Sequence, residues 1–344
     1  MTRYIIRRIL QAIPLLFFVS IILFFLMGQM GDPVATMGGR RVTRPADRER
    51  LTRQLGLDQP FHRQYLYWLI GNDWQQIDVD GDGVAETTGT RRGILRGDFG
   101  NSLMKRGQTA WEVIWDRVPN TLLLMVTAEV VIVIFALLIG IFSAMRQYTV
   151  ADHVITAVSF IGFSTPIFFF ALLSIYIFSV NFKRWGLPYL PAVGMFDPQV
   201  GKTVGQVALH MILPVMTIAF VSIAAYSRYI RSTMLEVLNQ DYIRTARAKG
   251  LRGRYILLVH ALKNASLPIV TLIGLDLALL LGGALVTERI FAWPGMGRLF
   301  LDHMQRFDVP VVMGILIILS ITVVVFQILT DLTYAVLDPR IRYE

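Results

Sequence analysis

Six long apolar stretches alternate with polar segments along the chain. They cover residues 9–30, 120–145, 155–180, 207–230, 265–287 and 309–335. A transmembrane helix needs about 20 mostly apolar residues to cross about 30 Å of hydrocarbon, and each stretch is long enough to do so. Pro14, Pro166 and Pro214 interrupt three of them, which membrane helices tolerate where neighbouring groups satisfy the freed backbone. The pattern predicts an all-α integral membrane protein with six transmembrane helices.

The polar segments between these stretches predict three regions. Residues 1–30 are expected to form an N-terminal anchor helix, because the apolar run is longer than that of a cleaved signal peptide and no Ala-x-Ala site follows it. Residues 31–119 are expected to form a long extracytoplasmic loop or subdomain, and residues 120–344 a five-helix core. Within that core, the polar loop 231–264 is expected to face the cytoplasm.

Charge sets the expected orientation of the chain. The sequence carries 33 Lys and Arg against 24 Asp and Glu, a net charge of +9. In a soluble protein this excess would suggest a nucleic-acid partner, but only 17% of the residues are charged, against about 25% in typical soluble chains. In membrane proteins the basic residues of short loops stay in the cytoplasm. Loop 231–264 is strongly basic, so we expect both termini to be cytoplasmic and no nucleic-acid partner.

The long loop after the first stretch contains a segment with helical periodicity. Residues 59–70 carry aromatic and aliphatic side chains at helical spacing. They predict a short helix, which either lies at the outer membrane interface, where Tyr and Trp are favoured, or packs inside a small external subdomain.

An acidic turn in the same loop resembles the start of a calcium-binding loop. Asp at alternating positions followed by Gly lets carboxylates converge on one hard cation. Position twelve of an EF-hand should be a bidentate Glu, and here it is Gly89, so the motif is not a complete EF-hand. A shorter loop would bind a structural calcium ion through Asp78, Asp80, Asp82, the carbonyl of Val84, and Glu86. The alternative is a solvated acidic turn.

The loop between the fourth and fifth stretches predicts two short helices. Residues 242–249 contain good helix formers, and Asn239 or Asp241 can cap the helix that they form. Gly250 suits the position that follows a helix C-terminus. A second amphipathic helix, 254–264, then leads into the fifth stretch. The two helices would present a compact knob to the cytoplasm.

Small and basic side chains make the first of these helices suited to a protein partner. Ala246 and Ala248 would let a partner backbone approach closely, and Arg244, Arg247 and Lys249 would meet acidic groups on that partner. The helix has no lipid-sized apolar face, so a protein cleft is its natural environment.

Three acidic residues lie in or near the apolar stretches. Ionisable groups in a bilayer are costly and mark either a transport pathway or a buried pair. Asp276 is the first pathway candidate, because nearby glycines would let a substrate or a helix approach it, and Glu129 is the second. The alternative for both is a structural hydrogen bond or ion pair between helices. Asp331 is expected to meet Arg340 or Arg342.

Several segments, taken in chain order, resemble one family of membrane proteins. Segment 241–251 is similar to the Glu-Ala-Ala loop of ABC-importer permeases, in the form found in dipeptide, oligopeptide and nickel-type permeases, with Arg244-Thr245-Ala246 standing where the general motif has Glu-Ala-Ala. Further similar segments are 31–33, 55–60, 97–102, 117–121, 260–265, 291–297 and 338–342. The resemblance covers nearly the whole chain, apart from residues 72–94, which look like an insertion.

This resemblance implies the type I permease fold of an ABC importer, in the cytoplasmic membrane of a bacterium or archaeon. Such a subunit pairs with a second homologous permease, two ATPase subunits and an extracytoplasmic substrate-binding protein, and it is surrounded by membrane lipid. ATP and Mg would bind to the partners, because this chain has no Gly-x-x-x-x-Gly-Lys-Ser/Thr phosphate loop and is not expected to be an enzyme. The implied ATPase-coupling residues are Asp241, Tyr242, Arg244, Thr245, Ala246, Arg247, Ala248, Lys249 and Gly250.

The substrate implied by the resemblance is a di- or oligopeptide, although the same architecture also imports nickel chelates, sugars and other solutes. A different class of function is a proton-coupled secondary transporter, in which the membrane carboxylates form a proton relay. Such a carrier does not need a cytoplasmic loop of this form, which favours the importer. The chain has no His-Glu-x-x-His, no Gly-x-Ser-x-Gly and no cysteine, which argues against a membrane-embedded hydrolase and excludes disulfides and thiolate metal sites.

Overall fold

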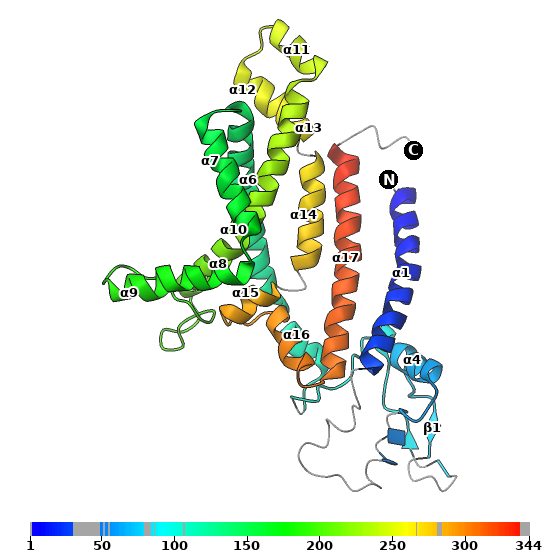
Figure 1. The fold of residues 1–344 in the computed structure, drawn as a ribbon. Helices are drawn as coiled ribbons and strands as arrows, with labels where there is room; N and C mark the ends of the chain where they lie inside the picture. The colour runs from blue at the N-terminus through cyan, green and yellow to red at the C-terminus, as the bar shows by residue number, and fades with distance from the viewer. Residues whose placement is uncertain are drawn as a thin grey trace. The chain divides into compact units, whose positions relative to one another are not determined.

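The computed structural model describes residues 2–29, 49–50, 52–53, 56–78, 84–85, 87–105, 107–265, 267–280 and 284–337. Its secondary structure is almost entirely helical (Figure 1). In the described residues, five helices are long and apolar enough to cross a membrane, and a bent pair of shorter helices makes a sixth candidate. The five are Ile6–Gly28, Ala110–Met145, Ile167–Arg184, Val204–Leu238 and Val309–Thr333, and the bent pair is Gly253–Ala265 with Ile269–Leu277. Each of the six predicted stretches therefore contains a helix.

Contacts between residues divide the chain into two compact units, which we describe separately. The α1 unit comprises residues 6–118 and 299–321, and the core unit comprises residues 1–5, 119–298 and 322–344. The α1 unit holds most of α1 (Thr2–Gly28), α4 (Phe61–Ile70), β1 (Gln76–Ile77), β2 (Thr87–Thr88), the 3₁₀ helix η1 (Ile94–Arg96), α5 (Ala110–Trp115), and parts of α16 (Met296–Met304) and α17 (Val309–Leu337).

Aromatic side chains fix α4 against α1. The ring of Phe24 on α1 has its centroid 5.5 Å from that of Tyr65 and 5.3 Å from that of Trp68. The hydroxyl of Tyr65 also shares a hydrogen bond of 2.7 Å with the hydroxyl of Ser20. The predicted helix over 59–70 is therefore present, and it packs against the first apolar helix of the same chain.

A small antiparallel sheet follows α4, with β1 and β2 paired through Gln76 opposite Thr88 and Ile77 opposite Thr87. The predicted calcium ligands belong to the segment between these strands. Asp78 and Val84 are among the described residues, whereas Asp80, Asp82 and Glu86 lie outside them.

A buried carboxylate attaches the loop before α5 to the start of α17. Asp308 is fully buried and accepts hydrogen bonds from the Ser102 hydroxyl at 2.6 Å and from the backbone N–H groups of Leu103 and Met104 at 3.1 Å. Nδ1 of His303 lies 2.8 Å from the same carboxylate. Burial alone would raise the pKa of Asp308, but these hydrogen bonds outweigh burial and lower it.

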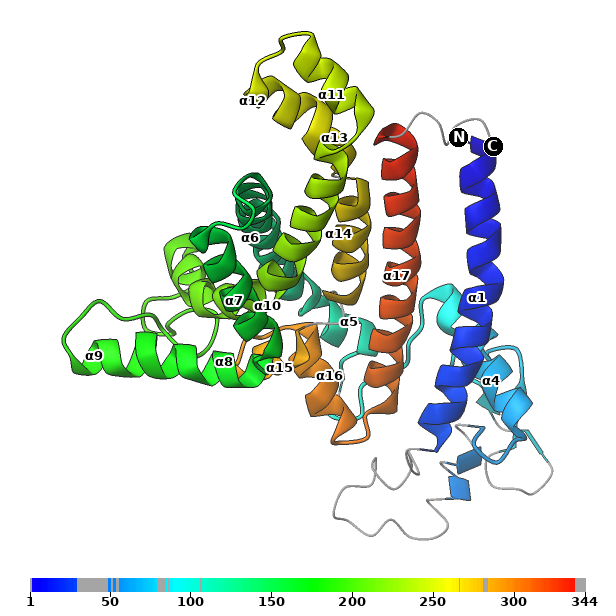
Figure 2. The ribbon, with the colours of Figure 1, turned by 45° about the horizontal axis from the view of Figure 1, so that its top comes forward.

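The core unit is arranged around α10, with α6, α7 and α14 lying along it (Figure 1, Figure 2). Its elements are α6 (Val118–Met145), α7 (Val150–Ser164), α8 (Ile167–Ser174), the π-helix η2 (Ile175–Asn181), α9 (Phe182–Arg184), α10 (Val204–Leu238), α11 (Asp241–Ala248), α12 (Gly253–Tyr255), the π-helix η3 (Ile256–Ala261), α13 (Leu262–Ala265), α14 (Leu267–Leu280) and α15 (Leu285–Ile290). Buried apolar side chains of α6, α10 and α11, among them Ile132, Ile230 and Ile243, belong to one core cluster.

The third apolar stretch is two helices rather than the single helix that its pattern predicts. α7 ends at Ser164, Thr165 is extended with φ −83° and ψ 123°, and Pro166 precedes α8. Proline has no backbone N–H and disfavours helical geometry in the residue before it, so the break falls at Pro166. Beyond the break, α8, η2 and α9 run away from α7 at a steep angle (Figure 1).

The helix of the fifth stretch in the described residues is α14. α14 has 14 residues, and residues 281–283 lie outside the described part of the chain. Residues 253–265 and 269–277 form the bent pair, with an angle of 51° between them.

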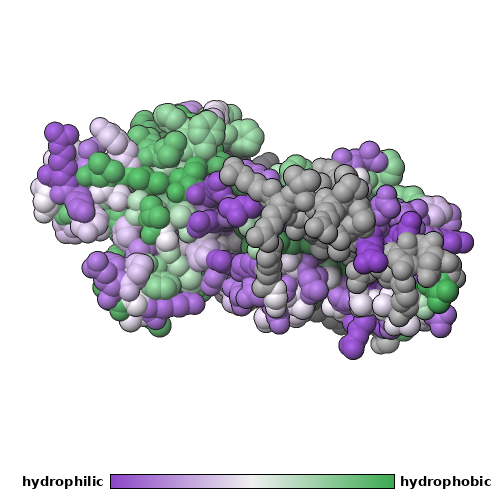
Figure 3. All heavy atoms as spheres, turned by 90° about the horizontal axis from the view of Figure 1, so that it is seen from below, coloured by the Kyte–Doolittle hydropathy of each residue, from purple (hydrophilic) through white to green (hydrophobic). Residues whose placement is uncertain are grey.

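α8 exposes a strongly apolar surface. Phe168, Phe169 and Leu172 on α8, together with Tyr176 on the adjoining η2, are all exposed over more than half of their surface, between 52% and 58%. Figure 3 shows hydrophobic side chains gathered on the side of the molecule where α8 lies, bordered by hydrophilic ones. Such a surface is stable against lipid or against another membrane helix.

α6 and α10 approach closely at Gly140. A Cβ atom on Gly140 would lie 2.7 Å from Cγ2 of Ile230 and 2.8 Å from the carbonyl oxygen of Ser227. A methyl group cannot fit at these distances, so only glycine allows the two helices to lie this close without a shift of α10.

Gly140→Ala and Gly205→Ala are the same substitution at a crowded position and at an open one. A Cβ atom on Gly205, in the first turn of α10, would meet nothing within 4 Å. We expect Gly140→Ala to lower the free energy of unfolding by about 1–3 kcal/mol through overpacking, and Gly205→Ala to leave it unchanged or raise it by about 0.4–1 kcal/mol. Thermal unfolding of the detergent-solubilised protein measures both, and equal midpoints for the two variants would contradict the close approach of α6 and α10.

Candidate functional site

The predicted cytoplasmic knob is a helical hairpin at the end of α10 (Figure 2). α10 ends at Leu238 with Asn239 as its C-cap, and α11 begins at Asp241 with Gln240 as its N-cap. The prediction that Asn239 or Asp241 caps α11 is therefore wrong. The side-chain amide of Asn239 instead donates to the Leu235 carbonyl at 2.9 Å. Asp241 lies in the first turn, where a negative charge favours the helix N-terminus.

Gly250 ends α11 as the sequence predicts. It has φ +74°, and its N–H donates to the Arg247 carbonyl at 2.9 Å, while the N–H of Leu251 donates to the Ala246 carbonyl at 3.3 Å. This pair of bonds is the Schellman arrangement, which requires a left-handed residue just after the helix. Glycine adopts that conformation without strain.

α11 has one face packed inside the chain and one face exposed. Ile243 and Ala246 are 0% and 6% exposed and belong to the core cluster of their own unit. Ala246 therefore packs against this chain's own core, which differs from the expectation that a partner backbone contacts it. The exposed residues of the helix and its C-terminal turn are Asp241, Tyr242, Arg244, Thr245, Arg247, Ala248, Lys249 and Gly250. A partner can reach α11 only through this second face.

The second predicted helix supports α11. Residues 253–265 form one helical run made of α12, η3 and α13, in agreement with the amphipathic helix predicted over 254–264. The side-chain amide of Asn264 donates to the Tyr242 hydroxyl at 3.1 Å. Ile256 is buried in the same cluster as the inner face of α11. The two helices and the end of α10 consequently form one packed element.

An ion pair between a buried carboxylate and a partly exposed arginine joins the first turn of α7 to α10. Arg231 donates to Asp152 from Nε at 3.0 Å and from Nη2 at 2.8 Å. Asp152 is 2% exposed and also accepts hydrogen bonds from the Ser143 hydroxyl and from the backbone N–H of Tyr148. Arg231 is the main reason that the pKa of Asp152 is lowered, and Ser143 and Tyr148 lower it further although burial opposes them. α7 is thereby fixed near the end of α10 that carries α11.

Two carboxylates share one hydroxyl inside the core unit. The Tyr226 hydroxyl lies 2.8 Å from Oδ2 of Asp276 and 3.3 Å from Oε1 of Glu129, so α10 bridges α14 and α6. Glu129 is 4% exposed, and its Oε2 has no hydrogen-bond partner among the described residues. Among the described residues, neither Glu129 nor Asp276 forms an ion pair with a basic side chain. The structure therefore brings the two pathway candidates, Glu129 and Asp276, to the same hydroxyl, and no basic side chain of the described residues pairs with them.

The apolar pattern alone does not single out Tyr226, because tyrosine counts as hydrophobic in it. The signal that could find it is the phenol hydroxyl, which needs a partner when the ring is buried. One of the glycines near Asp276, Gly274, packs against Thr330 of α17 and so serves a helix contact. Arg340 and Arg342, the predicted partners of Asp331, lie outside the described residues.

A further buried carboxylate connects two of the segments that carry the family resemblance. Glu288 on α15 is fully buried and accepts hydrogen bonds from the Thr121 hydroxyl at 3.1 Å and from the backbone N–H of Arg298 at 2.9 Å. The indole N–H of Trp293 donates to the Asn120 carbonyl at 3.0 Å. The two segments are far apart in the sequence and form one hydrogen-bonded element.

Two family models match the chain. The model of the binding-protein-dependent transport system inner membrane component matches residues 136–343, and the model of its N-terminal region matches residues 1–125. The chain is 39% identical over 344 residues to the oligopeptide transport system permease protein AppB of Bacillus subtilis, with 100% of both chains covered. It is 35% identical over 365 residues to the dipeptide transport system permease protein DppB of Escherichia coli, again with 100% of both covered. It is 34% identical over 345 residues to the glutathione transport system permease protein GsiC of Escherichia coli, also with 100% of both covered.

One solved structure has a similar fold. A chain from an inward-facing conformation of the MetNI methionine ABC transporter superimposes with a TM-score of 0.52 at 17% identity, covering 66% of this chain and 97% of that one. This likeness agrees with the type I permease fold expected from the sequence.

The ion pair between Asp152 and Arg231 predicts a dependence of stability on pH. Because the pKa of Asp152 is lowered in the folded state, its contribution to stability is complete above the unfolded pKa of about 3.9 and is lost as the pH falls below it. We expect Asp152→Asn to lower the free energy of unfolding by about 3 kcal/mol at pH 7, since it leaves Arg231 without its partner. Thermal unfolding at a series of pH values should show the gap between wild type and variant starting to narrow as the pH falls below about 4 and continuing to narrow with further acidification.

Asp241→Asn is the matched control, because the Asp241 side chain is 95% exposed. It should change the midpoint little at every pH. A constant gap between wild type and Asp152→Asn across the acidic range would contradict the lowered pKa.

Proposed function

This chain belongs to the family of binding-protein-dependent transport system inner membrane components, and we propose that it forms half of the translocation pathway of an ATP-driven peptide importer. It is a multi-pass inner membrane permease subunit and not an enzyme, since the ATPase of such importers resides on partner subunits. The family favours ATP-driven import over the proton-coupled alternative. The observation that carries the peptide proposal is the full-length match to permeases named for peptide transport.

Membership of this family implies an ATPase partner and a substrate-binding partner. The proposed assembly has two ATPase subunits on the cytoplasmic side, an extracytoplasmic binding protein on the other side, and a second homologous permease. Both termini lie in the cytoplasm in this proposal. The strongly basic loop 231–264 supports that orientation, because basic residues of short loops stay in the cytoplasm.

We assign the ATPase contact to α11. Its exposed face offers Arg244, Arg247 and Lys249 to acidic groups and Ala248 to a closely packed backbone. Gly250 ends α11 in a fixed turn, so the basic side chains at the C-terminal end of the exposed face have a defined arrangement.

The inner face of α11 supports a mechanical role. Ile243 and Ala246 pack into the same core cluster as α10, so a displacement of α11 is passed to α10. The ion pair between Arg231 and Asp152 would carry that displacement on to α7. ATP-driven closure of the partner subunits could in this way reach the transmembrane helices.

The carboxylate pair of Glu129 and Asp276 supports a peptide substrate. The buried Glu129 and the half-buried Asp276 share only the Tyr226 hydroxyl, and together they form a site that attracts a cation. A peptide with a free N-terminus carries an ammonium group, whereas most sugars carry no charge. The relatives named for oligopeptide, dipeptide and glutathione transport fit this class of substrate.

The substrate proposal is tested with the complete importer in proteoliposomes, supplied with its binding protein and internal ATP. We expect saturable, ATP-dependent uptake of a labelled di- or tripeptide. Asp276→Asn should slow that uptake at least about tenfold if the carboxylate meets the ammonium group through a charge-assisted hydrogen bond. Uptake of a sugar or a nickel chelate in place of peptides would overturn the substrate while leaving the family unchanged.

The contact proposal is tested by reversing charge on α11. Arg244→Glu combined with Arg247→Glu should abolish co-purification of the ATPase subunits and reduce uptake at least about tenfold, because two charged contacts become repulsive. Both side chains are exposed, so membrane insertion and the thermal midpoint should remain as in wild type.

Arg252→Glu combined with Arg254→Glu is the matched control in the same loop. These two residues are also exposed, but they lie at the turn before and the start of α12 rather than on α11. Normal ATPase binding by the α11 variant, or equal loss in both variants, would remove α11 as the specific contact.

A further inference from the structure

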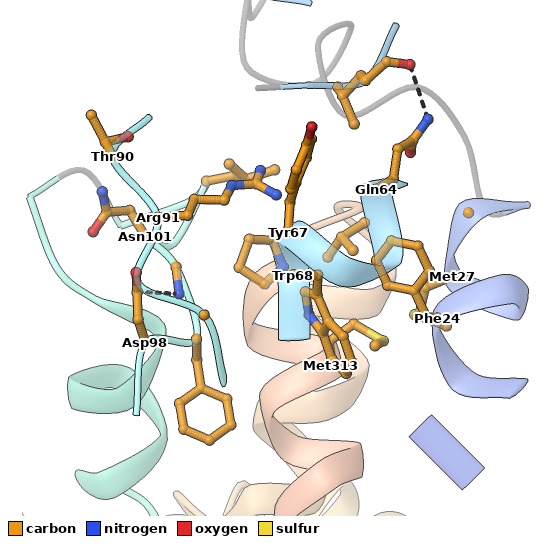
Figure 4. A pocket seen from close by; sticks show the side chains of 18 of the residues that line it. Phe24, Met27, Gln64, Tyr67, Trp68, Thr90, Arg91, Asp98, Asn101 and Met313 are labelled. Carbon is orange, nitrogen blue, oxygen red and sulfur yellow. Dashed lines mark hydrogen bonds between the residues drawn. The ribbon is translucent and has the colours of Figure 1, made fainter. Parts of the chain in front are cut away.

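A cavity of about 660 Å³ lies within the α1 unit (Figure 4). It is lined by the last turns of α1, by α4, by residues between 90 and 103 and by the first turns of α17. Figure 4 shows an apolar side with Phe24, Met27, Trp68 and Met313, and a polar side with Thr90, Arg91, Asp98 and Asn101. The cavity is therefore amphipathic.

The apolar side of the cavity belongs to two transmembrane helices. Met27 lies in the last turn of the span Ile6–Gly28, and Met313 lies near the start of the span Val309–Thr333. Both spans end at the cavity, which puts it at the depth where hydrocarbon gives way to lipid headgroups. Trp68 fits this depth, because tryptophan is enriched at membrane interfaces.

The polar side of the cavity holds a fixed cation. The backbone of Arg91 is held by the buried Asn72, whose N–H donates to the Arg91 carbonyl at 2.9 Å and whose side-chain oxygen accepts from the Arg91 N–H at 3.0 Å. Figure 4 shows the Arg91 side chain extending toward Tyr67. No hydrogen bond from its guanidinium is present among the described residues. The five N–H donors of a guanidinium suit a bidentate anion such as phosphate.

An anion lies beside this cation. Asp98 accepts hydrogen bonds from the backbone N–H groups of Arg92 at 2.8 Å and Gly100 at 2.9 Å, which fix its carboxylate. It attracts Arg91 electrostatically. A carboxylate has about four acceptor positions, so Asp98 can still accept a hydrogen bond from a ligand. The cavity thus offers a cation and an anion next to an apolar wall.

We propose that this cavity binds one molecule of phosphatidylethanolamine. Arg91 donates to the phosphate, Asp98 accepts from the primary ammonium group, and the acyl chains follow α1 and α17 into the hydrocarbon. Phosphatidylglycerol fits less well, because its net negative headgroup meets the charge of Asp98. Phosphatidylcholine fits less well, because its trimethylammonium group has no N–H to donate. The inference rests on the membrane insertion of α1 and α17 and is independent of the proposed substrate and of α11.

Lipid binding is tested on the full chain, purified in detergent with its partner subunits and delipidated. Native mass spectrometry and thermal unfolding are followed with phosphatidylethanolamine, phosphatidylcholine, phosphatidylglycerol, inorganic phosphate and dialanine. We expect one phosphatidylethanolamine to be retained and to raise the midpoint. The apparent affinity should be at least about tenfold weaker for phosphatidylcholine, which loses one charge-assisted hydrogen bond.

Arg91→Gln should weaken the binding of both lipids, whereas Asp98→Asn should remove the preference for phosphatidylethanolamine over phosphatidylcholine. Arg92→Gln is the matched control, because Arg92 is the exposed neighbour of Arg91 and does not line the cavity. It should bind lipid as wild type does.

Four results would overturn the proposal. They are equal affinity of the wild type for phosphatidylethanolamine and phosphatidylcholine, unchanged binding by Arg91→Gln, the same midpoint shift with inorganic phosphate alone, and displacement of the lipid by dialanine. The first comparison uses only the wild-type protein, so it holds even where a variant fails to fold. Displacement by dialanine would instead make the cavity a peptide site.

Discussion

The absence of water from the hydrocarbon core is the constraint on which the rest of this structure depends. A backbone N–H or C=O without a partner in that region costs several kcal/mol, so the chain crosses as helices whose bonds are internal. The helical run is interrupted where the sequence removes a donor, as at Pro166. The π-helix η2 keeps its backbone bonded across an irregular stretch, which a simple loop could not do inside the hydrocarbon.

The same constraint separates two kinds of carboxylate that lie inside the structure. Asp152, Glu288 and Asp308 each receive at least two hydrogen bonds from fixed donors, including backbone N–H groups. Their negative charges hold loops and helix ends together. Glu129 and Asp276 share one hydroxyl that can donate to only one of them at a time. A carboxylate with unused hydrogen-bond acceptor positions can interact with a cation, whereas a carboxylate whose positions are all used by fixed donors cannot.

The periodic and local features of this chain could be predicted from the sequence, and the contacts between distant segments could not. Apolar runs predict the spans, and Gly250 predicts the end of α11, because both depend on residues next to each other. Helical spacing also contains the information that Ala246 shares a face with Ile243, although composition alone makes Ala246 look available to a partner. The partners of Glu288 and the closeness of Glu129 to Asp276 depend on the packing of several helices, which no local pattern encodes. The break at Pro166 falls between these cases, because proline marks the position but packing sets the new direction.

Gly140 has a consequence for how this subunit can change shape. Ile230 and the Ser227 carbonyl lie against its backbone, so sliding α6 along α10 would bring a residue with a Cβ atom to a contact that has no room for one. Sliding of α6 along α10 is therefore disfavoured at this contact. The contact favours movement of the two helices together, and the break between α7 and α8 is a position where the chain can hinge instead.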